Sequence, residues 1–141
     1  MAFAVAVPSI SFAQFAKPED EVRYRKAALT VMASHFGRIG AVVKGDRPFN
    51  AQEVQANAAL VETMSTLPWA GFGPGTDKID SKAKPEIWSQ ADKFKTAQDT
   101  MIKAVADLST ASKSGNLDAV KAAFGGVGKT CKGCHDDFRK E

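Results

Sequence analysis

The sequence predicts an all-α protein that folds as an antiparallel four-helix bundle. Apolar residues recur every seven positions along several long segments, as expected for the buried face of a packed helix. Helix start and stop signals divide the chain into four such segments, and none shows the alternation of apolar and polar residues that is typical of strands. Two of the three connections between the segments are short, which favours antiparallel neighbours.

The first helix is expected to begin at Pro18 and to end near Lys44 and Gly45. Proline is favoured in the first turn, where its missing N–H costs nothing. Acidic residues at 19–21 suit the positive end of the helix dipole. Pro48 prevents any continuation of this helix.

The second helix is expected to begin after Asn50 and to run to about Thr66. Asn50 is a good N-cap, and Glu53 follows three residues later in a pattern that resembles a capping box. Pro68 then ends the helix, and residues 68–75 form a loop that is rich in glycine and proline.

The third and fourth helices are expected to be joined by a short turn. The third begins at Pro85 and Glu86 and runs to Ser114, where Gly115 provides a stop signal. Asn116 then caps the fourth helix, which continues nearly to the end of the sequence.

The seven-residue rows identify the candidate core of the bundle. Most of their members are expected simply to pack against one another. The rows are Val22, Leu29, Phe36 and Val43, with Met32 and Ile39, in the first helix; Val54 and Val61, with Leu60 and Leu67, in the second; Ile87, Phe94, Met101 and Leu108 in the third; and Leu117, Phe124, Cys131 and Phe138, with Val120, Val127 and Cys134, in the fourth.

Composition is that of one globular domain. The 141 residues are 44% hydrophobic and 25% charged, which disfavours a disordered or a membrane-spanning chain. The formal net charge is only +3, with acids and bases interleaved and no basic cluster. Nucleic acid is therefore not an expected partner.

Residues 1–13 resemble the end of an export signal. The segment carries no charge, and Ser11-Phe12-Ala13 provides a small-x-small cleavage pattern before Gln14. It is short and lacks a positively charged start, which is consistent with a truncated signal; the alternative is an apolar N-terminus of a cytosolic protein. We expect residues 14–141 to form one domain that is exported to the periplasm. No membrane span is expected, because the apolar segment 1–13 is too short to cross a bilayer.

The chemistry of the chain is concentrated in the sequence Cys131-Lys132-Gly133-Cys134-His135. Two thiols at this spacing can add to the two vinyl groups of haem, and the adjacent imidazole can then bind the iron. On a helix, Cys131 and Cys134 both occupy positions on the apolar rows, so we expect the bundle to enclose the covalently bound haem c, with His135 as an iron ligand.

Three other interpretations of this motif are weaker. A structural zinc site needs four ligands, and the chain has two cysteines and only one other histidine, His35. A thioredoxin-like redox pair expects a βαβ setting, which the sequence lacks. A disulfide between residues three apart on a helix has poor geometry. The remaining candidates for a second iron ligand are Met32, Met64, Met101 and His35.

The whole of 14–141 resembles the cytochrome c′ family of c-type cytochromes. The resemblance is carried by KPED and ASHFG in the first helix, LPWAGFGPGT in the loop, PEIW before the third helix and CKGCHDDFRK at the motif. It implies five-coordinate, high-spin iron with His135 on the proximal side and Leu29 over the distal face. Some low-spin relatives instead place a methionine ligand in the first helix, and Met32 is the candidate here.

Further residues are assigned to the haem site. Arg25 lies on an apolar row, where a charge is costly unless it is paired, and a haem propionate would be a partner; its head could instead reach water. The resemblance adds Lys26 as a propionate contact, Asp80 at the haem edge and Arg139 near the proximal pocket. Arg139 could equally serve as a cation at a helix C-terminus.

We therefore expect a monohaem cytochrome that binds nitric oxide and carbon monoxide and can exchange electrons between ferric and ferrous iron. An apolar distal pocket without a hydrogen-bond donor disfavours dioxygen, and the resemblance implies that nitric oxide can displace His135. The alternative is a low-spin electron carrier. No enzymatic activity is expected, since no distal His–Arg pair is present. The family also implies a homodimer through the first two helices, and small redox proteins are candidate partners.

Overall fold

A computed structural model describes residues 14–141, and the expected export signal at 1–13 lies outside them. The all-α prediction is confirmed: within 14–141 there is no strand, and β pairing is limited to one bridge between Ala83 and Arg139. The elements are α1 (Pro18–Val43), α2 (Ala51–Met64), the 3₁₀ turns η1 (Pro68–Gly71) and η2 (Thr76–Lys78), α3 (Glu86–Ser89), α4 (Ala91–Lys113) and α5 (Leu117–Phe138).

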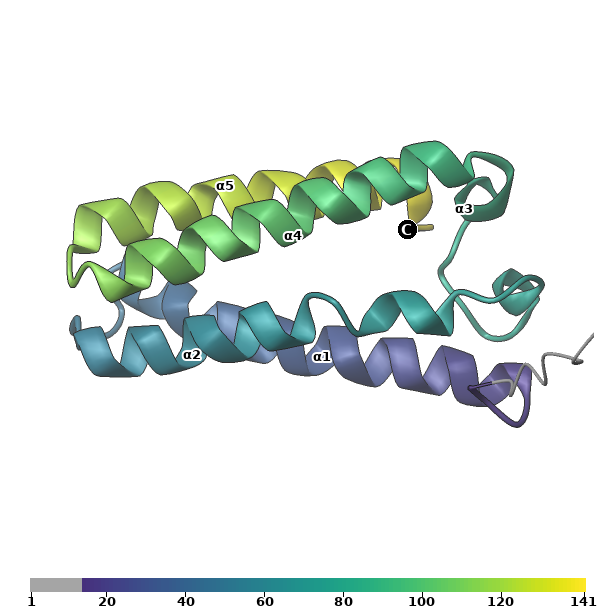
Figure 1. Ribbon diagram of the computed structural model, residues 1–141, viewed down its shortest axis with the longest axis horizontal. Helices are drawn as coiled ribbons and strands as arrows, with labels where there is room; N and C mark the ends of the chain where they lie inside the picture. The colour runs from purple at the N-terminus through teal and green to yellow at the C-terminus, as the bar shows by residue number, and fades with distance from the viewer. Residues whose placement is uncertain (1–13) are drawn as a thin grey trace, which may run out of the picture.

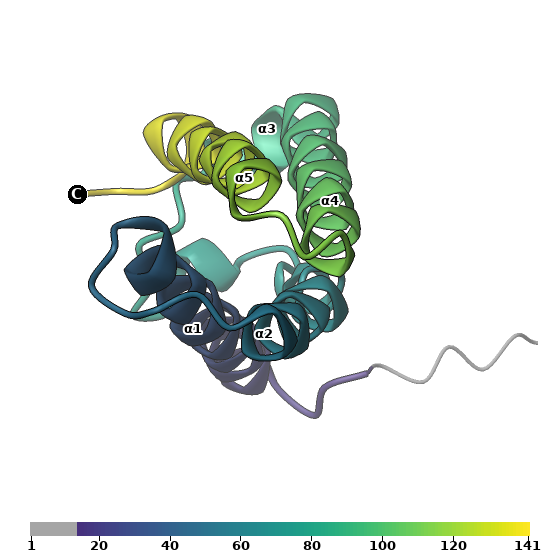
Figure 2. The same cartoon turned by 90° about the vertical axis from the view of Figure 1, so that its left-hand side faces the viewer.

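The four long helices form the bundle. Figure 1 shows α1 and α2 as one pair and α4 and α5 as the other, with α3 and the loop before it at one end. Helix α2 packs against α4 and joins the two pairs, whereas α1 and α5 contact each other far less. Figure 2, viewed along the bundle, shows the four helices around a common centre. The core at that centre includes Ile39, Val54, Ala58, Val61, Val105, Leu108, Val120 and Val127.

The capping residues act as the sequence predicts. Asn50 accepts a hydrogen bond on its side-chain oxygen from the backbone N–H of Glu53 at 3.0 Å. Asn116 does the same for Ala119 at 3.0 Å. Each bond satisfies one of the N–H groups that have no partner inside the helix, which fixes the start of α2 and of α5. Pro18 occupies the first turn of α1.

The prediction of one continuous third helix is wrong. The segment is divided at Gln90 (φ −122°, ψ 50°) into the short α3 and the long α4. Tertiary contacts account for the break: the indole of Trp88 donates a hydrogen bond to the carbonyl of Phe72 at 2.9 Å, and Ile87 is buried with the cluster around Phe94 and Phe138. These contacts hold α3 against the loop and the end of α5.

For the second helix, the prediction that the row of Leu60 and Leu67 belongs to the core is also wrong. Val54 and Val61 are buried, but Leu60 and Leu67 are 44% and 37% exposed. A helix this short buries a narrow face, and the row of Val54 and Val61 fills it. In the third segment, by contrast, all four members of the predicted row are buried.

Arg25 holds the loop between α2 and α3. It is 3% exposed, and its two terminal nitrogens donate four hydrogen bonds to the loop: to the carbonyls of Gly71 (2.7 Å) and Thr76 (3.1 Å) and to the hydroxyls of Thr76 (2.6 Å) and Ser81 (2.6 Å). The guanidinium also lies 4.5 Å from the ring centre of Phe72. A buried cation is stable only with such partners, so the loop and α1 depend on each other.

The other end of the loop is tied to the C-terminal end of α5. The N–H of Lys84 donates to the carbonyl of Phe138 at 2.9 Å, and the N–H of Lys140 donates to the carbonyl of Lys82 at 2.7 Å. These two bonds flank the bridge of Ala83 and Arg139. The loop therefore connects α1 to the residues that directly follow the Cys-x-x-Cys-His motif.

Within residues 14–141, no helix is both long enough and apolar enough to cross a membrane.

Replacing Gly71 by alanine is expected to destabilise the protein. A Cβ at this position would lie 2.6 Å from the carbonyl oxygen of Glu21 and 2.9 Å from the Cβ of Arg25, both too close. Relief would require α1 and the loop to separate, at a cost of about 1–3 kcal/mol. Guanidinium unfolding of the holoprotein measures the change.

Gly125→Ala is the matched control for Gly71→Ala. A Cβ at this exposed position in α5 meets nothing within 4 Å. Alanine is favoured over glycine inside a helix by about 1 kcal/mol, so this variant should be as stable as the parent or more stable. Equal losses in both variants would contradict the close packing of Gly71.

Candidate functional site

One large cavity lies between α1, α4 and α5 at the loop end of the bundle. Its volume is about 820 Å³, within the range of small-molecule and cofactor sites. The wall is mainly apolar, and the charged residues that line it come from α1, the loop and the residues after α5. The apolar part of the lining includes Leu29, Met32, Phe36, Val61, Trp69, Phe72, Ile87, Phe94, Met101, Val105, Val127 and Phe138.

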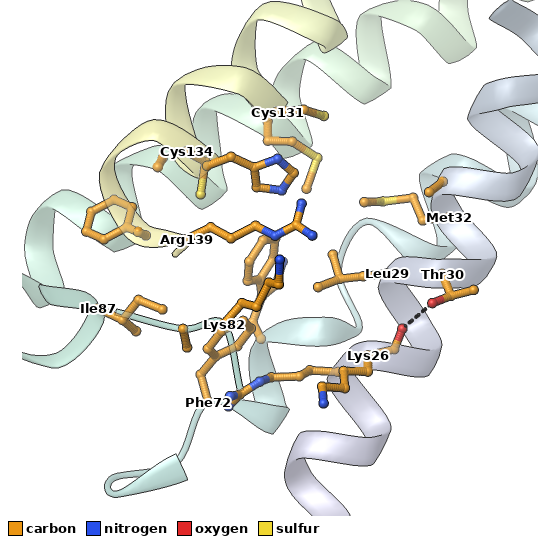
Figure 3. A pocket seen from close by; sticks show the side chains of 18 of the residues that line it. Lys26, Leu29, Thr30, Met32, Phe72, Lys82, Ile87, Cys131, Cys134 and Arg139 are labelled. Atoms are coloured by element: carbon orange, nitrogen blue, oxygen red, sulfur yellow. Dashed lines mark hydrogen bonds between the residues drawn. The ribbon is translucent and has the colours of Figure 1, made fainter. Parts of the chain in front are cut away.

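Helix α5 brings the motif to this cavity. Cys131, Cys134 and His135 all line it, and Figure 3 shows both thiols on the side of α5 that faces α1. The helical spacing of three and four residues places the three groups on neighbouring positions of one helix face. The motif requires this geometry if all three side chains are to bind one ligand.

Neither cysteine of 14–141 forms a disulfide, and burial disfavours the thiolate form of both side chains. Burial raises the pKa of Cys131, and a hydrogen bond with Thr130 opposes this. Burial, followed by the proximity of the Cys131 thiol and the Asp137 carboxylate, raises the pKa of Cys134 to about 11. Thiols of this kind are poor nucleophiles and do not suit the catalytic pair of a thioredoxin-like enzyme.

The imidazole of His135 favours its neutral form. Partial burial lowers the pKa of His135, the positive charge of Arg139 lowers it further, and Asp136 opposes the change. Neutral imidazole is the form that binds a metal. The backbone carbonyl of His135 accepts a hydrogen bond from the N–H of Arg139 at 3.0 Å, which keeps the last turn of α5 closed at the site.

The middle of helix α1 forms the opposite wall, mainly with apolar side chains. Leu29 and Met32 point from α1 toward α5 across the cavity (Figure 3). Phe36 follows one turn later and stacks on Phe124 of α5, with ring centres 4.2 Å apart and an angle of 12° between the planes. Leu29 and Phe36 are only partly buried, although their row was predicted as core, because they face the cavity.

Arg25, Lys26, Lys82 and Arg139 line the cavity together with one acid, Asp80. The terminal nitrogens of Arg25 are engaged by the loop. Burial lowers the pKa of Arg25, and the charges of Glu21 and Asp77 oppose this. The amine of Lys26 donates to the backbone carbonyl of Asp80 at 2.5 Å and lies 3.5 Å from its carboxylate.

The cavity gathers every residue that the sequence assigned to the site. They are Arg25, Lys26, Leu29, Asp80, Cys131, Cys134, His135 and Arg139. Lys82 is a lining residue that sequence reasoning missed. It lies in an irregular loop, where no periodicity indicates which side chain faces inward, so only the contact between the loop and the end of α5 reveals it.

The remaining interpretations of the motif lack support in 14–141. No group of three or more histidine, cysteine, aspartate or glutamate side chains in this range could hold a metal ion. His35 lies apart from the cavity, and its Nδ1 is 2.8 Å from the side-chain oxygen of Asn57 in α2. The donor set is instead one imidazole beside two thiols, in a wall that is otherwise apolar. That set fits a flat apolar macrocycle with two vinyl groups and one iron.

Known proteins agree with this site. Residues 20–139 match the family model described as Cytochrome C′. The chain is 54% identical to cytochrome c′ of Alcaligenes xylosoxydans xylosoxydans over 128 residues, which are 91% of this chain and 99% of that protein. It is 48% identical to cytochrome c′ of Rubrivivax gelatinosus, over 91% of this chain and all of that protein.

Solved structures extend the agreement to the fold. The nitric oxide complex of a mutant of cytochrome c prime from Alcaligenes xylosoxidans superposes with a TM-score of 0.86 at 52% identity and covers 91% of this chain and 99% of that one. The expected bundle is thus confirmed by its relatives as well as by its helices. The chain belongs to the cytochrome c′ family, and its cofactor is haem c.

Proposed function

We propose that this protein is a periplasmic monohaem cytochrome that binds nitric oxide and carbon monoxide at a five-coordinate, high-spin haem. The observation that carries the proposal is the cavity itself: one wall holds Cys131, Cys134 and His135, and the facing wall at Leu29 is apolar. When bound, haem c supplies one iron that changes between ferric and ferrous states and can take a diatomic gas.

The residues of α5 hold and orient the cofactor. The thiols of Cys131 and Cys134 would form the thioether links, and the neutral imidazole of His135 would bind the iron. All three project from one helix that packs against α4, so the scaffold fixes their positions relative to one another. Arg139, the residue that follows α5, adds a positive charge beside His135.

Leu29 lies on the wall of the cavity opposite His135 and would limit access to the iron from that side. Its side chain lines the cavity and brings no hydrogen-bond donor, and Met32 and Phe36 are also without a polar hydrogen. The hydroxyl of Thr30, which lines the cavity beside Leu29, already donates to the carbonyl of Lys26 at 2.7 Å. Such a surface gives bound dioxygen nothing to stabilise its developing negative charge, whereas nitric oxide and carbon monoxide do not require a donor. The nitric oxide complex of a mutant of the Alcaligenes xylosoxidans relative supports this choice of ligand.

A low-spin electron carrier is the second candidate, and one observation favours it. Met32 lines the same cavity one turn from Leu29, and its thioether is directed inward (Figure 3). A methionine ligand would close the gas site and suit exchange of electrons with a small redox protein. The apolar position of Met32 fits ordinary packing equally well, since methionine is a common core residue.

The proposal also includes the location of the protein and its assembly. Export to the periplasm fits the uncharged, signal-like segment 1–13. We propose no enzymatic activity, because His135 is the only histidine among the described residues that line the cavity, so no second histidine is available as a distal acid or base. A homodimer through α1 and α2 fits the exposed side chains of Val31 on α1 and Leu60 on α2, which are 42% and 44% exposed.

Replacing both Cys131 and Cys134 by alanine is expected to abolish covalent haem. The haem stain of a denaturing gel should then vanish, while a single Cys134→Ala variant keeps one thioether and part of the stain. A control replacement of Ser89, an exposed residue of α3, by alanine should leave the stain unchanged. Retained stain in the double variant would contradict attachment through this motif.

Optical and resonance Raman spectra test the gas site. The ferrous holoprotein should be high-spin and should shift when nitric oxide or carbon monoxide is added. Leu29→Ala should speed carbon monoxide binding at least tenfold, because the side chain that fills the facing wall is removed. A rate that stays within twofold of the parent would contradict a blocking role for Leu29.

Met32→Leu is the matched variant for the spectra. It keeps the volume of the side chain and removes the sulfur, so a five-coordinate protein should show no change in spin state. If the parent is low-spin and Met32→Leu is high-spin, Met32 is an iron ligand and the electron-carrier function replaces the gas-binding one.

A further inference from the structure

We propose that Lys82 binds a carboxylate of the cofactor and thereby raises the reduction potential of the haem. The inference rests on the proposed haem function and concerns a residue that the sequence motif does not reach. It assigns to the loop before α3 a direct part in tuning the site.

Four cationic side chains among residues 14–141 line the cavity. Haem carries two propionate carboxylates, and a carboxylate beside an apolar wall is stabilised by a cation or by hydrogen-bond donors. The cationic side chains that line this cavity are Arg25, Lys26, Lys82 and Arg139.

Two of these cations, Arg25 and Lys26, already have partners in the protein. Both terminal nitrogens of Arg25 donate to Gly71, Thr76 and Ser81 of the loop. The amine of Lys26 donates to Asp80. Arg25, which the sequence suggested as the propionate partner, is thus largely committed to holding the loop.

Lys82 and Arg139 are the other two cations that line the cavity. Among residues 14–141, no carboxylate lies within ion-pair distance of Lys82 or Arg139, and neither side chain donates a hydrogen bond to the protein. Figure 3 shows both side chains directed into the space between α5 and α1. Two neighbouring cations repel each other, and a carboxylate between them removes that cost.

The backbone fixes Lys82 in this position. Its carbonyl accepts the N–H of Lys140 at 2.7 Å, and the next residue, Ala83, bridges Arg139. Ser81, the residue before it, accepts a hydrogen bond from Arg25 at 2.6 Å. Lys82 is therefore held between α1 and the end of α5, so its amine is carried on an anchored segment.

Arg139 is the less suitable site for the test. It lies four residues after His135 and changes the pKa of that imidazole, so its replacement would alter the iron ligand as well. Lys82 has no such contact, which makes its charge separable from the ligation of iron.

The experiment measures the reduction potential of three holoprotein variants: Lys82→Met, Lys82→Arg and Lys78→Met. A cation near the haem disfavours the ferric state, so Lys82→Met should lower the potential. We expect the equilibrium constant for reduction to fall about tenfold, which is about 59 mV for one electron. Lys82→Arg keeps the charge and should restore most of the loss.

Lys78→Met is the matched control. Lys78 lies in the same loop, is exposed and does not line the cavity. Its replacement removes the same charge from the protein, so a general electrostatic effect would appear in both variants. Equal potentials in Lys78→Met and Lys82→Met overturn the proposal, and so does a drop in Lys82→Met that arginine fails to restore.

A second readout does not depend on redox chemistry. Brief acylation of the holoprotein with acetic anhydride, followed by peptide mass spectrometry, compares the reactivity of Lys82 and Lys78. An amine of Lys82 that is paired with a carboxylate should react at least fivefold more slowly than that of Lys78; equal rates overturn the proposal.

The failure of this proposal can be told apart from the failure of the proposed function. A parent protein without covalent haem would refute the proposed function itself, whereas normal haem with an unchanged reduction potential in Lys82→Met refutes only the role of Lys82.

Discussion

The buried guanidinium of Arg25 is the interaction on which the site end of the bundle depends. A cation that is 3% exposed is tolerated only with partners, and all of those found here belong to the loop between α2 and α3. Arg25 thus defines the loop's path, and the loop in turn supplies Phe72, Asp80 and Lys82 to the cavity. Removing the charge would leave several buried acceptors without a donor, which costs about 1–3 kcal/mol for each group.

Local signals in the sequence were enough to predict the helices and the chemistry of α5. Asn50 and Asn116 cap their helices as expected because capping involves only residues three positions apart. The motif at 131–135 likewise lies within two turns, so its placement on one wall follows from helical periodicity once the rows are identified. Leu29 was singled out by family resemblance; periodicity alone made it one core residue among many.

Contacts between distant segments account for what could not be predicted. The break at Gln90 depends on Trp88 meeting Phe72, and the partners of Arg25 lie 46 to 56 positions further along the chain. The rows also could not tell which of two faces of α2 would be covered, and Leu60 lies at the surface. In each case the decision is made by the arrangement of other elements and leaves no trace in the local sequence.

The weak contact between α1 and α5 changes how the cofactor contributes to stability. The cavity separates these two helices, so a macrocycle in it takes the place of the side chains that would otherwise join them. A freely dissociating ligand stabilises a fold by an amount that rises with its concentration and disappears on dilution. Thioether links remove that dependence, because the group remains attached in the unfolded chain. The core of this bundle is therefore completed by a covalently attached cofactor that dilution cannot remove.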